Sequence, residues 1–167
     1  MLTSGANLFQ GIGIAAELPL NPLYFTEIAV PEIVTIPDEK PDIEMILSCM
    51  VEAEVISTRL ITTPCMKSYE GQLLSGRKLI IELKLKQKIT YVADEPDQSE
   101  HSADFENVVT SVFIVLPQRI DNTSIETLFK KNKIIVTPYI EDIYCEMMDE
   151  RTIFKNITLL LDLSFKC

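Results

Sequence analysis

The clearest pattern in the chain is an alternation of apolar and charged positions between residues 78 and 91. Apart from Gln87, the odd positions are apolar, and most of the even positions are charged. The apolar positions are Leu79, Ile81, Leu83, Leu85, Ile89 and Tyr91, and the opposite ones include Lys78, Glu82, Lys84, Lys86 and Lys88. Because successive side chains of a strand point to opposite faces, this pattern predicts a strand with one buried face.

Further strands are predicted along the rest of the chain. The same alternation occurs over residues 51–55 and 153–165, and a longer strand is expected over residues 133–147. Pro138 should place that longer strand at a sheet edge or a bulge, because proline cannot donate a ladder hydrogen bond. Residues 108–116 are apolar on both faces, which predicts a central or doubly covered strand.

Helical signals are weak and short. One helix is expected over residues 40–47, with Pro41 near its first turn and acidic residues at its N-terminal end. Another is expected over residues 123–129, with Asn122 as the N-cap. At least six strands with so little helix predict an all-β fold, an antiparallel β-sandwich or jelly-roll-like single domain.

The N-terminal segment differs in composition from the remainder. We divide the chain into residues 1–39, an apolar arm or a set of extra strands, and residues 40–167, the main β domain. Glu17 is the sole charge in the first 26 residues, so the apolar side chains must be buried somewhere. They either pack as extra strands on their own domain or pair with a neighbouring subunit by strand addition. The residues expected to make an assembly arm are Leu8, Phe9, Ile12, Ile14, Leu18 and Leu20.

Composition and charge restrict the classes of partner. The chain is 47% hydrophobic and 24% charged, and its formal net charge is −10. Such an acidic chain repels phosphate backbones, and its lysine clusters lack interleaved aromatic residues, so no nucleic-acid binding is expected. No run of 18 apolar residues occurs, so no membrane span is expected. The first 20 residues carry no Lys or Arg, which argues against a signal peptide and for synthesis and retention in the cytoplasm of the producing cell.

Catalytic and metal-binding patterns are weak. The four cysteines form no CxxC pair, and His101 is the single histidine, so no zinc site is predicted. The sequence has no GxSxG motif, and we predict a non-enzymatic protein without catalytic, metal or cofactor-binding residues. Cys49 and Cys167 are candidates for an intermolecular disulfide, Cys167 above all because a chain end can reach outward. The alternative is that the cysteines are reduced, half-buried thiols.

Three blocks of sequence resemble the SPOCS domains of bacterial spore-coat proteins. The first is residues 40–48 (KPDIEMILS), and the second is residues 89–94 (ITYVAD), followed by residues 101–105 (HSADF). The third is residues 140–144 (IEDIY), leading into residues 149–153 (DERTI). Their order and spacing match the family pattern from about residue 40 to residue 167.

The resemblance implies a β-rich module of spore-forming Firmicutes that helps to build the spore envelope. The family often carries a LysM peptidoglycan-binding domain after its SPOCS units, whereas this sequence contains neither a LysM domain nor a second unit. The resemblance brings no catalytic residues. It implies a protein of the coat, the exosporium or a surface appendage, made in the mother-cell cytoplasm and found at the spore surface.

Two functions are consistent with these observations. The first is a structural subunit that self-assembles into a homo-oligomer or filament through edge-strand and arm contacts, with other spore-coat proteins as further partners. The second is a sporulation adaptor that docks a coat morphogenetic protein without self-assembling. In the adaptor, the lysine face of Lys84, Lys86 and Lys88 would meet an acidic partner.

Overall fold

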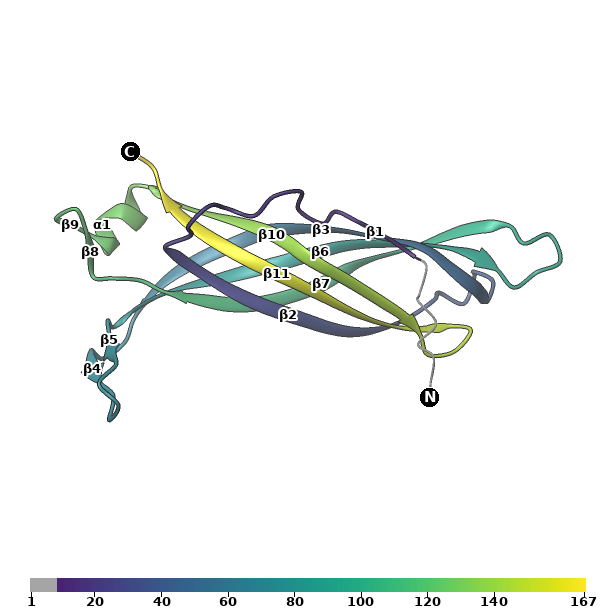
Figure 1. Ribbon diagram of the computed structural model, residues 1–167, viewed down its shortest axis with the longest axis horizontal. Helices are drawn as coiled ribbons and strands as arrows, with labels where there is room; N and C mark the ends of the chain where they lie inside the picture. The colour runs from purple at the N-terminus through teal and green to yellow at the C-terminus, as the bar shows by residue number, and fades with distance from the viewer. Residues whose placement is uncertain (1–8) are drawn as a thin grey trace.

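The alternating segment forms β6 (Arg77–Ala93), and its two faces differ in the way that the sequence predicts. The odd-numbered side chains from Leu79 to Ala93 are all buried, including Gln87, whereas the even-numbered ones are partly or fully exposed. The computed structural model describes residues 9–167, and β6 runs along the length of the molecule (Figure 1). The expected strand is confirmed.

Two sheets, one of which contains β6, pack face to face and form an elongated all-β sandwich (Figure 1). The first sheet has the order β1-β3-β6-β7, built from β1 (Gln10–Ile12), β3 (Ile43–Thr62), β6 and β7 (Glu100–Val115). The second sheet has the order β10-β11-β2, built from β10 (Ile134–Met147), β11 (Thr152–Phe165) and β2 (Tyr24–Thr35). All neighbours pair antiparallel except β1, which runs parallel to β3. The predicted fold class is confirmed.

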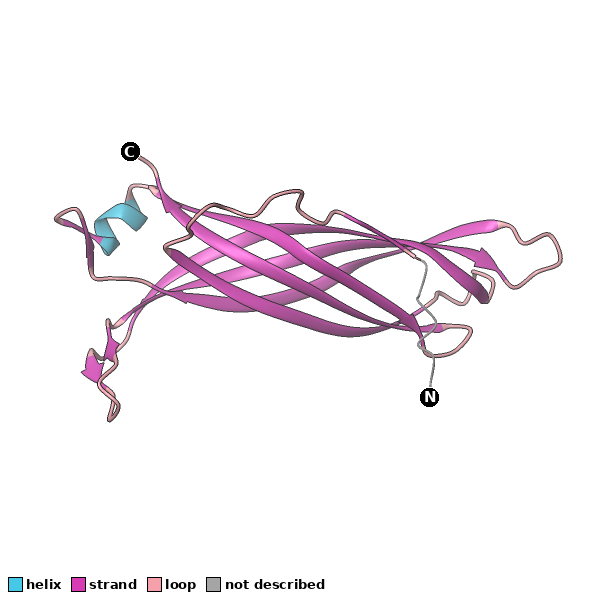
Figure 2. Cartoon of the chain, in the orientation of Figure 1, coloured by secondary structure: helices cyan, strands magenta, loops and turns pink. Residues whose placement is uncertain are grey.

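Small elements extend from one end of the sandwich, the end where the C-terminus also lies (Figure 1). They are the hairpin of β4 (Met66–Lys67) and β5 (Leu73–Leu74), the pair of β8 (Arg119–Ile120) and β9 (Thr123–Ser124), and α1 (Ile125–Lys130). Strand dominates throughout the described residues (Figure 2). The helix expected over residues 123–129 is present as α1, although its N-cap is Ser124 and not Asn122.

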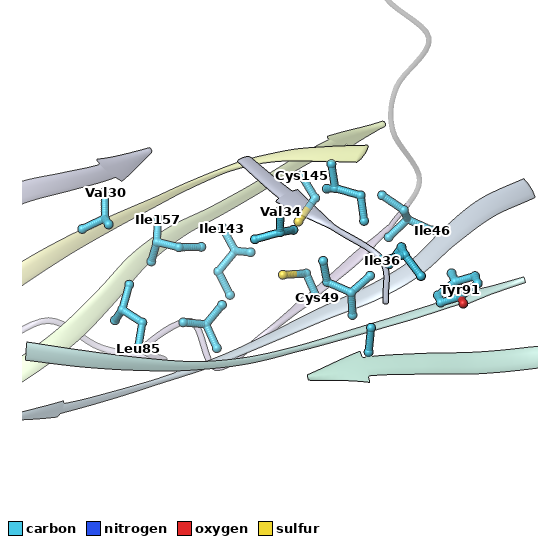
Figure 3. Packing of buried hydrophobic residues seen from close by; sticks show 14 of the residues in the cluster. Val30, Val34, Ile36, Ile46, Cys49, Leu85, Tyr91, Ile143, Cys145 and Ile157 are labelled. Carbon is cyan, nitrogen blue, oxygen red and sulfur yellow. The ribbon is translucent and has the colours of Figure 1, made fainter. Parts of the chain in front are cut away.

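The inward faces of both sheets build an interior with two apolar clusters. One part of it contains Val30, Val34 and Ile36, which belong to β2 and the residue that follows it (Figure 3). The other part joins Leu79, Ile81 and Leu83 of β6 to Leu161 and Leu163 of β11. Residues 24–36 thus contribute core side chains to the same sandwich as the strands that follow them.

The prediction of a helix over residues 40–47 is wrong, because β3 begins at Ile43. Register shifts interrupt the pairing of β3 with β6 between Ile43 and Met45 and again between Ile46 and Ser48. These irregularities place Ile43, Ile46 and Cys49 on the buried side. Buried residues three apart imitate one face of a helix, so local periodicity alone could not separate a bulged strand from a short helix.

The prediction of a central strand over residues 108–116 is also wrong. That stretch belongs to β7, which ends the first sheet, and the outward-facing Val109, Phe113 and Val115 are exposed by 58%, 46% and 48%. The strand expected over residues 133–147 is confirmed as β10, an edge strand that contains Pro138 and has a register shift between Ile140 and Asp142.

Candidate functional site

The described part of the N-terminal arm lies against its own domain. In β1, Gly11 pairs with Cys49 of β3, and the Ala15 N–H farther along donates a hydrogen bond of 2.8 Å to the Ile140 carbonyl of β10. The arm therefore bridges the seam where an edge of each sheet meets, as the dark purple trace beside β3 and β10 indicates (Figure 1).

Two glycines allow the arm to approach this seam so closely. A Cβ atom on Gly11 would lie 3.4 Å from Cβ of Ile143. At Gly13, which has a φ of +111°, a Cβ atom would lie only 2.1 Å from the Val51 carbonyl oxygen. Any side chain at residue 13 would both strain the backbone and collide with β3. The arm can therefore lie this close to β3 only with glycine at this position.

The residues predicted to make an assembly arm have different environments. Phe9 packs against the core, whereas Ile12, Ile14 and Leu18 are each close to half exposed and Leu20 is 94% exposed. Leu8 lies outside the described residues. The docked arm therefore still presents apolar side chains to solvent.

The lysine face lies between two rows of acidic residues. Lys86 forms an ion pair of 3.1 Å with Glu54 of β3, and Lys88 lies 3.8 Å from Asp104 of β7. The hydrogen bond that Lys86 donates to Glu54, together with the negative charge of Glu54, raises the pKa of Lys86. Lys84 has Glu54 as its register partner on β3. This face therefore carries both signs of charge, which weakens the electrostatic argument for an acidic partner.

The cysteines divide into a buried and an exposed group. Cys49 and Cys145 are buried, whereas Cys65 and Cys167 are exposed. Cys49 is 0% exposed, so it is not placed for the intermolecular disulfide expected from the sequence, which needs a thiol that a second chain can reach. Cys167 keeps the exposure that such a cross-link requires.

A charged cluster lies between the sheets, and the sequence analysis missed it. Lys155 of β11 is 0% exposed, and its Nζ atom lies 2.6 Å from Gln87 Oε1 and 3.1 Å from Glu32 Oε2 of β2. The Gln87 amide donates to the same Glu32 oxygen at 3.0 Å, and Lys155 Nζ also lies 4.9 Å from the Phe105 ring centroid. In the sequence, this cluster is indicated by Gln87 and Lys155, two polar residues on otherwise apolar strand faces.

Arg151 joins segments that are more than 100 residues apart in the sequence. Its guanidinium group donates to Asp42 Oδ1 at 2.5 Å and to the carbonyls of Lys40, Ile36 and Pro37 at 3.2, 3.0 and 2.8 Å. The bond to Asp42 raises the pKa of Arg151. This side chain holds the β10–β11 turn against the segment that leads into β3.

The three blocks of the SPOCS resemblance meet beside Arg151. Asp42 of the first block accepts from Arg151 of the third, and its carbonyl accepts from the Asp94 N–H of the second at 2.9 Å. The Tyr91 hydroxyl donates to the Pro41 carbonyl at 3.0 Å, and its ring stacks on His101 with centroids 6.0 Å apart. These contacts give the quoted residues a structural role at one end of the sandwich.

Replacing Arg151 with methionine should loosen this end without emptying the core. The side chain is about a third exposed, so we expect the melting temperature to fall by a few degrees, because one ion pair and three carbonyl hydrogen bonds are lost. Thermal unfolding followed by circular dichroism measures the change. Arg59→Met is the matched control on an exposed stretch of β3, and an equal melting temperature in both variants would contradict this role.

An exposed apolar surface follows β7. Val109, Phe113 and Val115 project from the outer face of the first sheet, and Lys78 Nζ lies 4.6 Å from the Phe113 ring centroid. Among the residues that the structure describes, β6 is the single strand that pairs with β7, so the other edge of β7 carries no strand partner. Sequence reasoning found this apolar run but placed it inside the sheet.

Residues 9–167 contain no helix with the length and apolar character needed to cross a membrane. The same residues contain no group of three or more His, Cys, Asp or Glu side chains placed to hold a metal ion.

Comparison of the chain with protein-family models, curated proteins and solved structures found no match. The resemblance to SPOCS domains therefore stays a prediction that rests on the three quoted blocks.

Proposed function

We propose that this chain is a non-enzymatic structural subunit that self-assembles through the edge of β7. The observation that carries the proposal is the apolar half of β7, where Val109, Phe113 and Val115 are exposed beside a strand edge that has no partner among the described residues. The resemblance to SPOCS domains supports placing this assembly in the bacterial spore envelope.

Edge strands pair readily with other chains because their backbone N–H and C=O groups remain available. Proteins that avoid such pairing place charges, prolines or bulges along the edge. Residues 109–116 of this chain (VTSVFIVL) contain no charge and no proline. An uncharged, β-branched edge with exposed apolar side chains favours strand addition by another β edge.

A second copy of the chain is a suitable partner for this edge. An antiparallel β7–β7 pair centred on Val112 places Val109 opposite Val115 and Ser111 opposite Phe113, all on the outer face. The acidic positions Asp104 and Glu106 lie outside this uncharged centre. A two-fold contact of this kind makes a dimer, and a further contact through the exposed apolar residues of the arm would extend the dimer into a polymer.

The test is assembly of the full-length protein with and without a charge on this edge. Phe113→Glu should shift the protein from ordered particles or filaments to monomers, because it replaces an apolar cross-strand contact and brings the like charges of the two copies close together about the two-fold axis. The fold should be retained, since Phe113 is exposed and Lys78 can pair with the new carboxylate. Negative-stain electron microscopy and analytical ultracentrifugation at matched concentrations measure the change.

Ile33→Glu is the matched control. Ile33 is an exposed apolar residue on β2 of the other sheet, so the variant adds the same charge away from β7 and should assemble as the wild type does. Assembly that persists in Phe113→Glu would reject the β7 interface. A wild-type protein that is monomeric at all concentrations would reject self-assembly and favour the adaptor function.

A further inference from the structure

Two cysteines from different sheets face each other inside the sandwich. Cys49 belongs to β3 and Cys145 to β10, and their sulfur atoms point toward one another in the interior (Figure 3). Both side chains are 0% exposed. Packed sheets usually lie about 10 Å apart, too far for a disulfide, which needs Cα atoms within about 7 Å. The β3–β10 seam is closer, since it contains residue pairs whose Cα atoms lie within 8 Å.

The surroundings of the two sulfurs make Cys49 the more readily ionised thiol of the pair. A hydrogen bond from the Cys145 thiol lowers the pKa of Cys49, and the positive charge of Lys155 acts in the same direction. The pKa of Cys145 is raised, first by this bond to Cys49 and then by burial. Cys49 is therefore the better nucleophile of the pair, because the thiolate is the reactive form.

The arm covers this pair. Gly11 of β1 is the register partner of Cys49 and also lies against Ile143, two residues before Cys145. The arm is held at this point by the Gly13 approach to Val51 and by the hydrogen bond from Ala15 to Ile140. An oxidant in solution can reach Cys49 from this side only after the arm has moved away.

We propose that Cys49 and Cys145 form an oxidation site, in which a small-molecule disulfide converts the two thiols into a bond between the sheets when the arm opens. This site goes beyond the proposed function and does not depend on it. The bond would join β3 to β10 at the seam that the arm also bridges, and would add a covalent link between the two sheets that does not depend on the arm.

The reaction is an ordinary thiol–disulfide exchange in two steps. The Cys49 thiolate attacks one sulfur of the small disulfide, whose S–S bond breaks and releases one thiol, and a mixed disulfide is left on Cys49. The Cys145 thiolate then attacks the Cys49 sulfur and releases the second thiol. The two protons of Cys49 and Cys145 end on the two released thiols, so the protein is oxidised by two electrons and the small disulfide is reduced by two.

The test uses the full chain with the exposed cysteines removed, the Cys65→Ser/Cys167→Ser background. Samples are incubated with oxidised glutathione under native conditions, quenched with acid and analysed by intact-mass and peptide mass spectrometry. We expect slow loss of two hydrogen masses and a peptide that links Cys49 to Cys145. The oxidised protein should also melt at a higher temperature than the reduced protein. Adding Cys145→Ala to the background should abolish the linked peptide.

Two further variants test the cover. Gly13→Ala strains the backbone and pushes the arm from β3, and Ala15→Pro removes the N–H that bonds to Ile140 without altering the core. Gly13→Ala should accelerate formation of the disulfide about tenfold or more, since forcing a side chain into a positive-φ position costs roughly this factor. Ala15→Pro should accelerate it in the same direction, because the arm loses its hydrogen bond to Ile140. Circular dichroism establishes that each variant is folded, and either one suffices if the other does not fold.

Three results would overturn the proposal. Unmodified thiols after prolonged incubation of every variant would show that the two sulfurs do not react. A glutathione adduct that persists on Cys49 would show that Cys145 cannot reach it. Equal rates in the background protein and in the folded arm variants would show that the arm is not the cover.

Discussion

Lys155→Met is expected to lower the free energy of unfolding by about 3 kcal/mol, the lower part of the range for breaking a buried ion pair. Methionine keeps the volume and the apolar stem of lysine but leaves the Glu32 carboxylate without its cation and Gln87 Oε1 without its donor. The lower figure applies because the Glu32 side chain is 21% exposed and can recover some hydration. Urea denaturation at neutral pH measures the loss.

Two companion variants separate charge burial from general damage. Lys84→Met removes a lysine from the solvent side of β6 and should change the free energy of unfolding by less than about 0.5 kcal/mol. Glu32→Gln added to Lys155→Met should restore part of the lost stability, because it removes the uncompensated carboxylate. Equal losses in Lys155→Met and Lys84→Met would show that the cluster between the sheets is not a buried ion pair.

Leu83→Ala is expected to cost about 3 kcal/mol, within the range of roughly 2–5 kcal/mol for emptying a buried leucine site. Leu83 is fully buried on the inner face of β6 and packs among side chains of both sheets, so its neighbours cannot easily close the cavity. The same denaturation experiment measures the change.

Leu20→Ala is the control with the same chemistry. Leu20 is 94% exposed, so this variant should alter the free energy of unfolding by less than about 0.5 kcal/mol. A large loss from Leu20→Ala, or none from Leu83→Ala, would contradict the exposure of Leu20 or the burial of Leu83.

The fold class and most long strands follow from the sequence, because alternation reports directly on a half-buried strand. The run from Leu79 to Tyr91 predicts β6 and its buried face, and Pro138 predicts an edge position that β10 indeed occupies. Local pattern fails where the geometry departs from regular alternation. The register shifts after Ile43 and Ile46 explain why the start of β3 resembled a helix.

Strand order and polar contacts depend on partners that are distant in the sequence. The run beginning at Val109 has the composition of a buried strand, and its exposure follows from its place at the end of the first sheet. In the same way, Lys155 and Gln87 each look like an isolated exception to an apolar face. They become a cluster only when Glu32, 123 residues before Lys155 (155 − 32), is brought beside them.

The middle position of β11 in the second sheet has a consequence for biosynthesis. β2 pairs with β11 along its whole length, and residues 24–35 are translated more than 100 residues before β11 (Thr152–Phe165). Until β11 leaves the ribosome, β2 has no partner strand in its own sheet, and its apolar side chains stay available to chaperones or to other nascent chains. Formation of the second sheet is therefore a late step with a large loop to close, and we expect it to limit the folding rate.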